Sequence, residues 1–297
     1  MISSMNRLSL ERRARVLNLL VEGVSMRAIT RLEGVGINTV ARLVDSAGEA
    51  AAAYHDEHVR GIEGRRLIEC DEVWAFVYAK KRNVPTAKAA PEHAGDAWTF
   101  SAIDAKSKLV VSYLVGDRDG QSALALMDDL RSRLVDRPQI STDGLTAYRE
   151  AVEGAFGGDV DFAQVIKEYG KVGEAEGERQ YSPAVCTSIE KRRIEGDPDM
   201  AKANTSYVER SNLTMRMGNR RFTRLTNAFS KKMEKHAAMV NLFFLHYNFC
   251  RIHKTLRVTP AMEAGVDDTV RDVEWIARLV EARAPKPNRP KTYRKRG

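Results

Sequence analysis

The sequence predicts a mixed α/β sheet with flanking helices, preceded by an all-α segment, and three observations support this fold class. Apolar residues recur at helical spacing through the first fifty residues. From Leu67 the chain changes to three consecutive β-rich runs, and then alternates between helical and strand patterns. The 297 residues, of which 43% are hydrophobic and 30% charged, supply a real core and suffice for two or three structural units.

Three short helices are predicted in residues 1–47. Ser9 and Ser25 are suited to cap the first two, and Gly23 ends the first. The third covers about residues 37–45, after the turn "EGVG". The residues expected to face inward are Leu10, Ala14, Leu17, Val21, Met26, Ile29, Leu32, Val40 and Val44.

Two short helices joined by a glycine-containing turn are typical of a helix-turn-helix, whose second helix can lie in the major groove of DNA. Asn38, Thr39 and Arg42 would then contact bases or phosphates. A three-helix protein-interaction module is the alternative. Residues 48–66 follow as a polar helical linker with a glycine break.

Residues 67–265 are predicted to form a core around a five-stranded mixed sheet. Strand patterns lie at residues 66–81, 97–104, 109–116, 138–142 and 161–167, and helical patterns at 121–134 and 145–156. Three consecutive strands followed by helix, strand, helix and strand indicate that parallel and antiparallel neighbours share the sheet.

The second half of the chain is less regular. Residues 168–204 show no sustained period, and we interpret them as an insertion or long loop within the core. Helical patterns resume at Ser206 and again after Ser230. The later helix carries an apolar stripe of Met233, Ala237, Val240, Phe244 and Tyr247. A C-terminal helix over 266–282 and a basic disordered tail over 283–297 complete the chain.

The charge of the chain favours a polyanionic partner. The net charge is +8 and the pI about 9.4. No acid follows Glu281, whereas the tail carries Lys291, Arg294, Lys295 and Arg296, which we expect to bind DNA. A solubilising tail without a ligand is the alternative.

Cysteine usage and hydropathy indicate a cytoplasmic protein. Cys70, Cys186 and Cys250 form no close pair, which excludes a disulfide scaffold and a four-cysteine zinc site. The N-terminus lacks the apolar core of a signal peptide. The longest apolar run, "MVNLFFL", is too short to span a bilayer, so no membrane partner is expected.

Three acids stand out as candidate metal ligands. Asp71 lies in the middle of the first strand, where a charge is costly unless it is paired or binds a metal. Asp143 follows the strand "PQIST", and Glu209 lies in the first turn of a helix. If the first and fourth strands are neighbours, the two aspartates meet, and a helix across the sheet can add the glutamate. Such a set can bind two Mg²⁺ ions that act on a phosphodiester.

Basic residues follow Glu209 closely. Arg216 comes two helical turns later on the same face, where it could hold a phosphate beside the metals. Arg220, Arg221 and Arg224 extend this basic track, which we expect to contact DNA.

Each acid also has an ordinary structural interpretation. Ser206 and Glu209 fit a capping box, Asp143 before a glycine could be a turn residue, and Asp71 could pair with a core arginine. Most of the neighbouring acids are interpreted as turn or surface residues. They are Glu69, Glu72, Asp104, Asp117 and Asp119.

The stretch "TSYVERSNLTMRMGNRRFTR", its continuation "YNFCRIHKTLRVTP", and the segments "CDEVWAFV" and "STDGLTAY" resemble transposases of bacterial insertion sequences. Specifically, residues 65–265 resemble the insertion sequence one family. That resemblance implies a ribonuclease-H-like, integrase-type core with a catalytic, metal-binding triad of Asp71, Asp143 and Glu209, and a basic residue at Arg216. An N-terminal zinc finger, frequent in the family, has no counterpart here because no cysteine precedes Cys70. The interval between Asp143 and Glu209 is also long for related integrases.

The resemblance implies a DNA transposase that binds the inverted-repeat ends of an insertion sequence. Two Mg²⁺ ions, which Mn²⁺ can replace, would support strand cleavage and transfer of a 3′-OH into target DNA. Double-stranded DNA and a homodimer or higher oligomer on it are the expected partners. In the bacterial cytoplasm, such a protein would associate with the nucleoid when bound to DNA. A DNA-binding regulator without catalysis and a ribonuclease-H-type or Holliday-junction nuclease are the alternatives.

Overall fold

The computed structural model describes residues 8–170, 185–223 and 226–284. Within them lies one twisted sheet, with strand order β3-β2-β1-β4-β5-β6. The strands are β1 (Leu67–Val77), β2 (Gly95–Asp104), β3 (Val110–Gly116), β4 (Gln139–Thr142), β5 (Asp161–Gly170) and β6 (Val185–Glu195). Strands β1 to β3 form an antiparallel meander, β4 and β5 run parallel to β1, and β6 returns antiparallel to β5. The sheet is therefore mixed, as the sequence predicts.

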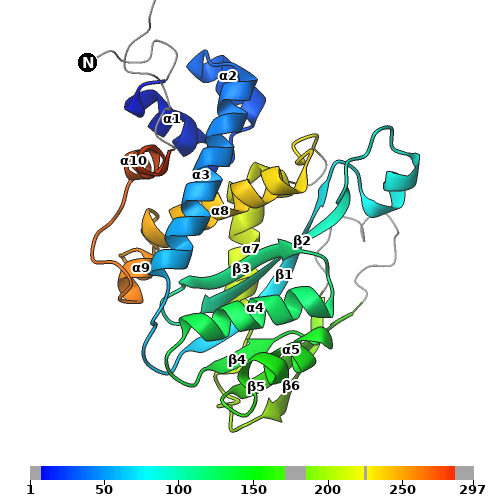
Figure 1. Ribbon diagram of the computed structural model, residues 1–297. Helices are drawn as coiled ribbons and strands as arrows, with labels where there is room; N and C mark the ends of the chain where they lie inside the picture. The colour runs from blue at the N-terminus through cyan, green and yellow to red at the C-terminus, as the bar shows by residue number, and fades with distance from the viewer. Residues whose placement is uncertain (1–7, 171–184, 224–225, 285–297) are drawn as a thin grey trace, which may run out of the picture.

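Helices cover both faces of this sheet. Helices α4 (Gly120–Arg133) and α5 (Ala147–Phe156) lie on the face toward the viewer in Figure 1. Helix α7 (Ser206–Gly218) crosses the opposite face, where it contacts β1 and β2. Helix α8 (Met233–Phe249) contacts β3 and continues the helical layer toward the N-terminal segment.

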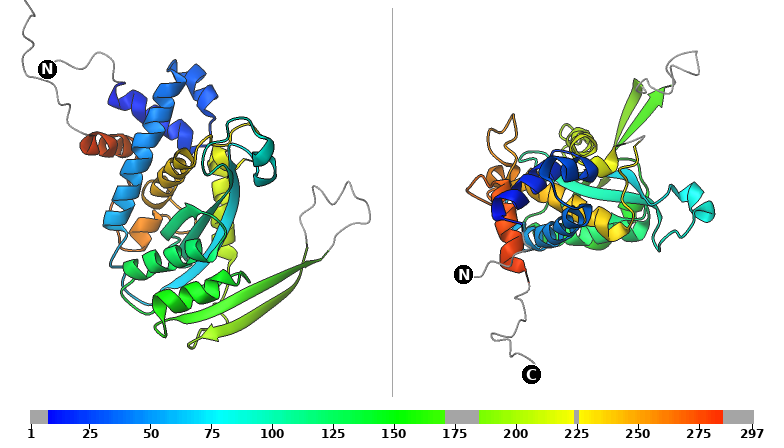
Figure 2. Two further views of the ribbon diagram at one scale, coloured as in Figure 1. Left: turned by 45° about the vertical axis from the view of Figure 1, so that its right-hand side comes forward. Right: turned by 90° about the horizontal axis from the view of Figure 1, so that it is seen from above.

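The described sheet has six strands, and the prediction of five is wrong. Strand β6 lies inside residues 168–204, which the sequence suggested to be an insertion or loop. Its side chains from Cys186 to Arg193 are all exposed, so the strand lacks the alternation of apolar and polar residues that reveals a half-buried strand. Figure 2 shows the β5–β6 hairpin extending away from the body of the protein.

Three helices precede the sheet: α1 (Leu10–Val21), α2 (Met26–Glu33) and α3 (Ile37–His58). The predicted caps are confirmed, because Ser9 accepts the N–H of Arg12 and Ser25 that of Ala28. Gly34 ends α2 in the left-handed conformation, with φ of 61°. The predicted inward position of Leu32 is wrong, since that residue is 66% exposed.

Helix α3 does not end near residue 45. It continues to His58, through most of the segment predicted as a linker, and packs along α8. At the crossing, a Cβ on Gly48 would lie 2.5 Å from atoms of Ala238, so only glycine permits this close approach. Ala50 and Ala51, within the segment predicted as a polar linker, are buried, as is Ala47 just before it.

The C-terminal part returns to the N-terminal helices. After the short α9 (Pro260–Glu263), α10 (Val273–Arg283) packs against α1 and α3. The prediction began this helix at residue 266, but Asp272 caps it by accepting the N–H of Trp275 at 2.6 Å. The predicted basic tail lies outside the described residues beyond Ala284.

One apolar core connects the N-terminal helices with the sheet. It runs from Leu17 of α1 and Val44 of α3 to Ile68 of β1 and Phe162 of β5. A second cluster, which includes Val73 and Phe244, fills the space between the sheet, α7 and α8. The N-terminal helices therefore share their main core with the sheet.

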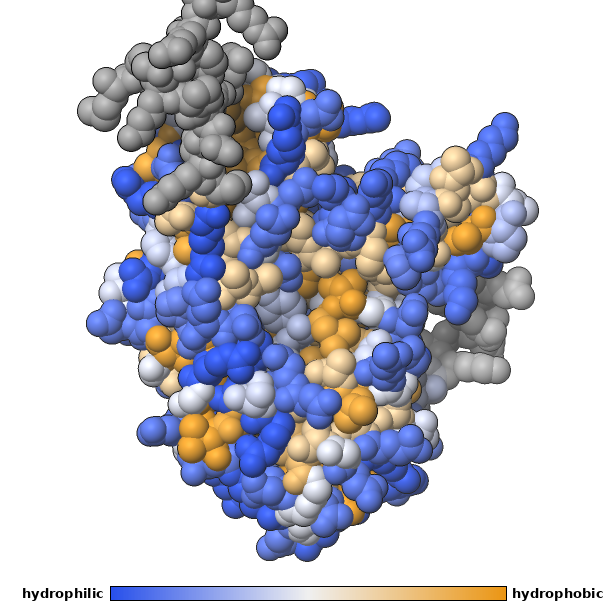
Figure 3. Space-filling model, viewed as in Figure 1, coloured by the Kyte–Doolittle hydropathy of each residue, from blue (hydrophilic) through white to orange (hydrophobic). Residues whose placement is uncertain are grey.

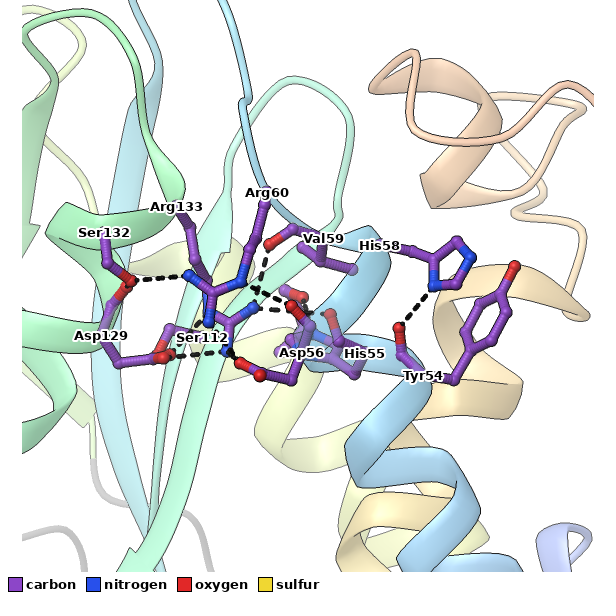
Figure 4. Close-up of polar contacts among 11 residues, drawn as sticks. Tyr54, His55, Asp56, His58, Val59, Arg60, Ser112, Asp129, Ser132 and Arg133 are labelled. Carbon is purple, nitrogen blue, oxygen red and sulfur yellow. Dashed lines mark hydrogen bonds and ion pairs between the residues drawn. The ribbon is translucent and has the colours of Figure 1, made fainter. Parts of the chain in front are cut away.

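A buried guanidinium ties the end of α3 to the sheet layer (Figure 4). Arg133, 5% exposed, donates to both carboxylate oxygens of Asp129 at 2.7 and 2.8 Å. The same side chain donates to the carbonyl oxygen of Val59 at 2.9 Å and to Asp56 at 3.1 Å. Nearby, the ring of His55 contacts the carbonyl oxygen of Val110 in β3, and burial lowers the pKa of His55 to about 4. These bonds fix α3 to α4 and β3.

The described residues contain no helix long and apolar enough to cross a membrane. The face shown in Figure 3 is mostly hydrophilic, and its apolar areas are small and separated.

Candidate active site

Parallel pairing of β1 with β4 brings the two predicted aspartates together. Cys70 pairs with Thr142, the last residue of β4, so Asp71 and Asp143 come next on adjacent strands. Carboxylate oxygens of Asp71, Glu72 and Asp143 all lie within 4.8 Å of one another. The carboxyl end of β4 thus gathers three acids at the centre of the sheet.

Asp71 lies in a partly buried, negatively charged environment. Its side chain accepts a hydrogen bond of 2.8 Å from the Nδ2 of Asn212, on α7. Burial is the largest cause that raises the pKa of Asp71 to about 7, and the negative charges of Glu72, Asp143 and Glu209 raise it further. Its hydrogen-bonding partner is thus an amide, and not the core arginine of the alternative interpretation.

Glu72 is a member of this group that the sequence analysis missed. The prediction placed most neighbouring acids in turns or at the surface, yet Glu72 is 7% exposed. Its carboxylate binds Arg118 at 2.6 Å and accepts a hydrogen bond of 3.2 Å from the hydroxyl of Tyr148. Burial and the charge of Asp143 raise its pKa, while Arg118 lowers it. The sequence signal that could have identified Glu72 was its position in a strand that is buried on both faces.

Glu69 is also buried, within strand β1, contrary to that interpretation, whereas Asp104 is buried but is a turn residue as predicted. Glu69 accepts the backbone N–H groups of Tyr207 and Val208 at 2.7 and 3.0 Å, so it satisfies the N-terminus of α7 from β1. Asp104 accepts the hydroxyl of Ser107 at 2.6 Å within the β2–β3 turn. Both acids have structural partners, and Glu69 fixes the position of α7 against the sheet.

Asp143 combines a turn role with its place in the acidic group. One of its carboxylate oxygens accepts the N–H of Leu145 at 2.9 Å, as in an Asx turn. The turn interpretation therefore describes this bond correctly. It does not remove Asp143 from the group, because the turn holds the side chain at the sheet edge beside Asp71.

Glu209 is near this group but does not join it. Among the described residues, the set of acids within 4.8 Å of one another comprises Asp71, Glu72 and Asp143. The Glu209 carboxylate instead pairs with Lys167 of β5 at 2.5 Å and accepts the hydroxyl of Thr205 at 2.7 Å. Thr205, the N-cap of α7, makes no side-chain capping bond, so the capping-box interpretation does not describe this helix.

The predicted basic residues after Glu209 have different surroundings. Arg216 lies half-buried near the end of α7, and Arg220 begins the short η2 (Arg220–Phe222). Arg221 points into the protein, where it donates to the sulfur of Met26 at 3.0 Å and to the carbonyl oxygen of Ala228 at 3.2 Å. Burial lowers its pKa. Arg221 is therefore not part of an exposed track, and Arg224 lies outside the described residues.

The predicted contacts of the N-terminal helices lie at the start of α3. Asn38 and Arg42 are exposed and Thr39 is half-buried, and the guanidinium of Arg42 donates to the carbonyl oxygen of Asn38 at 3.2 Å. The predicted tail contacts, Lys291, Arg294, Lys295 and Arg296, lie outside the described residues. A DNA-reading role for either set stays a prediction.

The turn between α1 and α2 touches the helix that carries Glu209. A Cβ on Gly23 would lie 3.1 Å from the carbonyl oxygen of Gly218, and one on Gly218 would lie 3.1 Å from the ring of Phe243. Gly23 also has φ of 75°, which disfavours any other residue. The predicted DNA-reading helices and the acidic group therefore meet through α7.

The donor set at the carboxyl end of the central strand β4 fits a hard divalent cation. Carboxylate oxygens are the ligands that Mg²⁺ and Mn²⁺ prefer. Burial, and then the charges of the neighbouring acids, raise the pKa of Asp71, and a bound cation would offset both effects. Because Glu72 is bonded to Arg118 and Tyr148, Asp71 and Asp143 are the acids best suited to bind an ion.

Comparisons with known proteins give a structural similarity but no sequence relative. No protein-family model matches the chain, and no curated protein matches it. Among solved structures, the chain is similar to the Mos1 transposase in its paired-end complex with the left transposon end. The two share 13% sequence identity, with a TM-score of 0.20. The match covers 52% of this chain and 59% of that chain, so this chain spans less than two thirds of its neighbour.

Proposed function

We propose that the protein is a DNA transposase that binds the inverted-repeat ends of an insertion sequence. In this proposal it cleaves DNA strands in a Mg²⁺-dependent reaction and transfers the 3′-OH to target DNA. The observation that carries the proposal is the meeting of Asp71 and Asp143 at the end of β4, with Glu209 on the helix that crosses them. An antiparallel meander of β1, β2 and β3, continued on the other side of β1 by the parallel strands β4 and β5, is consistent with a ribonuclease-H-like core.

Asp71, Asp143 and Glu209 would hold the ions, as the sequence resemblance implies. When bound there, Mg²⁺ would supply Lewis-acid chemistry at the attacking hydroxyl and the leaving oxygen. Asn212 orients Asp71 by its hydrogen bond. Lys167 holds Glu209 beside the group and provides a cation at the same place for a DNA phosphate.

The same proposal includes the family, the cellular location, the DNA contacts and the oligomeric state of the protein. The resemblance of residues 65–265 supports membership of the insertion sequence one family and a bacterial cytoplasmic, nucleoid-associated location. Asn38, Thr39 and Arg42 would read the terminal repeats, with Arg216, Arg220 and the basic tail on the phosphates. Because two ends must be joined, a homodimer or higher oligomer on DNA is proposed.

The test is a cleavage and strand-transfer assay with labelled element ends. We expect Asp71→Ala to retain DNA binding and to lose Mg²⁺-dependent cleavage, whereas Glu150→Gln, at an exposed position on α5, retains both. Cleavage that survives Asp71→Ala rejects the assignment. Hydrolysis without joining by the wild-type protein indicates a nuclease, and binding without nicking indicates a DNA-binding regulator.

A further inference from the structure

A cavity of about 580 Å³ lies between α2, η2 and residues 226–231. Its size falls within the range of roughly 300–1,000 Å³ that is usual for small-molecule sites. Four cationic side chains line it, and no acid is among its lining residues in the described part of the chain. These cations are Arg27, Arg220, Arg221 and Lys231.

The rest of the lining is largely apolar and includes an aromatic ring. The apolar lining residues are Leu20, Val24, Met26, Ile37, Ala228, Phe229 and Met239. The ring of Phe229 is held by Phe76 of β1, at 4.9 Å between centroids, and the ammonium of Lys231 lies 4.4 Å from its centroid. An aromatic face beside cations is the combination that binds an unstacked base together with its phosphate.

The cations of this cavity are incompletely compensated. The Nε of Arg220 is buried without a hydrogen-bond partner. Arg221 donates only to uncharged atoms in its described bonds, and Asp45, the acid that acts on its pKa, pairs with Lys235 at 2.6 Å. An anionic group in this cavity would provide a hydrogen-bond acceptor for Arg220 and would offset the buried positive charge of Arg221.

The cavity also lies within reach of the acidic group. Arg220 follows the end of α7, eleven residues after Glu209, which corresponds to roughly 16 Å at the helical rise of about 1.5 Å per residue. On the sheet side, Val77 at the end of β1 forms a bridge with Ser230, next to Lys231. A DNA strand that runs along α7 can thus touch both places.

We propose that this cavity binds one unpaired nucleotide of the DNA strand that reaches the acidic group. Its base lies against Phe229, and its phosphate lies on Arg220 and Arg221. The inference rests on the proposed function for the presence of DNA. It adds that this DNA is unpaired at a nucleotide a short distance from the reacting phosphodiester.

The test measures binding of a short fluorescein-labelled oligothymidylate and of a fully paired duplex of equal length, by anisotropy. All variants are made in the Asp71→Asn background and measured in EDTA, so a failure of the cleavage proposal leaves this test interpretable. We expect Phe229→Ala to weaken oligothymidylate binding about ten-fold, because base stacking is lost, and to leave duplex binding unchanged. Phe229→Tyr, which keeps an aromatic face, retains binding.

The predicted contact between Arg220 and a phosphate is tested separately. Arg220→Gln is expected to lower the salt slope of oligothymidylate binding by about 0.7, the value for one phosphate contact on a single strand. The matched control is Lys106→Gln, since Lys106 is exposed at the opposite end of the β1–β2 ladder from Val77. Thermal melting verifies folding, and Phe229→Leu replaces Phe229→Ala if the latter unfolds. The proposal is overturned if Phe229→Ala, or Phe229→Leu in its place, binds the oligothymidylate as Lys106→Gln does, or if it weakens duplex binding equally.

Discussion

Removing the charge of Asp71 is expected to stabilise the protein in the absence of metal. In the folded protein, burial and the neighbouring acids raise the pKa of Asp71 to about 7, compared with about 3.9 for an unperturbed aspartate. Ionisation is therefore easier in the unfolded chain. The contribution of Asp71 to the free energy of unfolding therefore falls as pH rises between about 4 and about 7, and stays constant above that range.

The size of this destabilisation follows from the difference between the pKa values of Asp71 in the folded and the unfolded chain. A difference of about three between the two pKa values corresponds to about 4 kcal/mol in the free energy of unfolding. Because Asp71 is only partly buried, solvent screening reduces this to about 2 to 4 kcal/mol. In Asp71→Asn, the amide has no charge to bury, and its oxygen can still accept the hydrogen bond from Asn212.

The assay is urea denaturation in EDTA across pH, with Asp128→Asn, an exposed position on α4, as the matched control. We expect Asp71→Asn to be more stable than wild type by about 2 to 4 kcal/mol near pH 8 and to match it near pH 4. Adding Mg²⁺ should stabilise the wild type more than the variant. A variant that is less stable near pH 8, or a difference that does not change with pH, refutes the electrostatic account of this site.

Four other changes probe the remaining features. Lys167→Gln releases Glu209 from its ion pair, so the midpoint of Mg²⁺-dependent thermal stabilisation should move to lower Mg²⁺; an unchanged midpoint contradicts a metal role for Glu209. Arg133→Met leaves Asp129 without its buried partner and should lower the free energy of unfolding by about 3 to 5 kcal/mol in urea titrations, more than Arg278→Met at an exposed position. Gly48→Ala places a methyl group against Ala238 and should cost about 1 to 3 kcal/mol, whereas a stability equal to wild type would mean that α3 and α8 separate easily. Truncation after Arg283 should weaken DNA binding uniformly and flatten its salt dependence, and an unchanged slope would assign the tail no contact.

Local signals in the sequence located most elements of the fold. Ser9 and Ser25 mark helix starts because a hydroxyl cap depends only on residues within one turn. Asp71 and Asp143 could be placed together because one strand pattern is interrupted by a charge and another ends at an acid before glycine. Both signals are read within a few residues of the acid itself.

The missed features depend on contacts between distant segments. Glu72 shares the strand position of Asp71, but its partners Arg118 and Tyr148 come to it across the fold. Strand β6 pairs through its backbone while its side chains face solvent, so no hydrophobic pattern marks it. The pairing of Glu209 with Lys167 likewise requires β5 to lie beside α7.

Helix α3 has a consequence for how such a protein could acquire a new recognition sequence. Its first turn carries the predicted DNA contacts, its middle lies against α8 through Gly48, and its last turn is anchored by Arg133. A chimera with its junction near residue 47 would divide α3 next to Gly48, where α3 lies closest to α8. It would also place the helix surface of another protein against α8. Exchange of the N-terminal helices should therefore succeed only with junctions after His58 and with a matching α8, so the predicted DNA-reading helices and the acidic group would be inherited together.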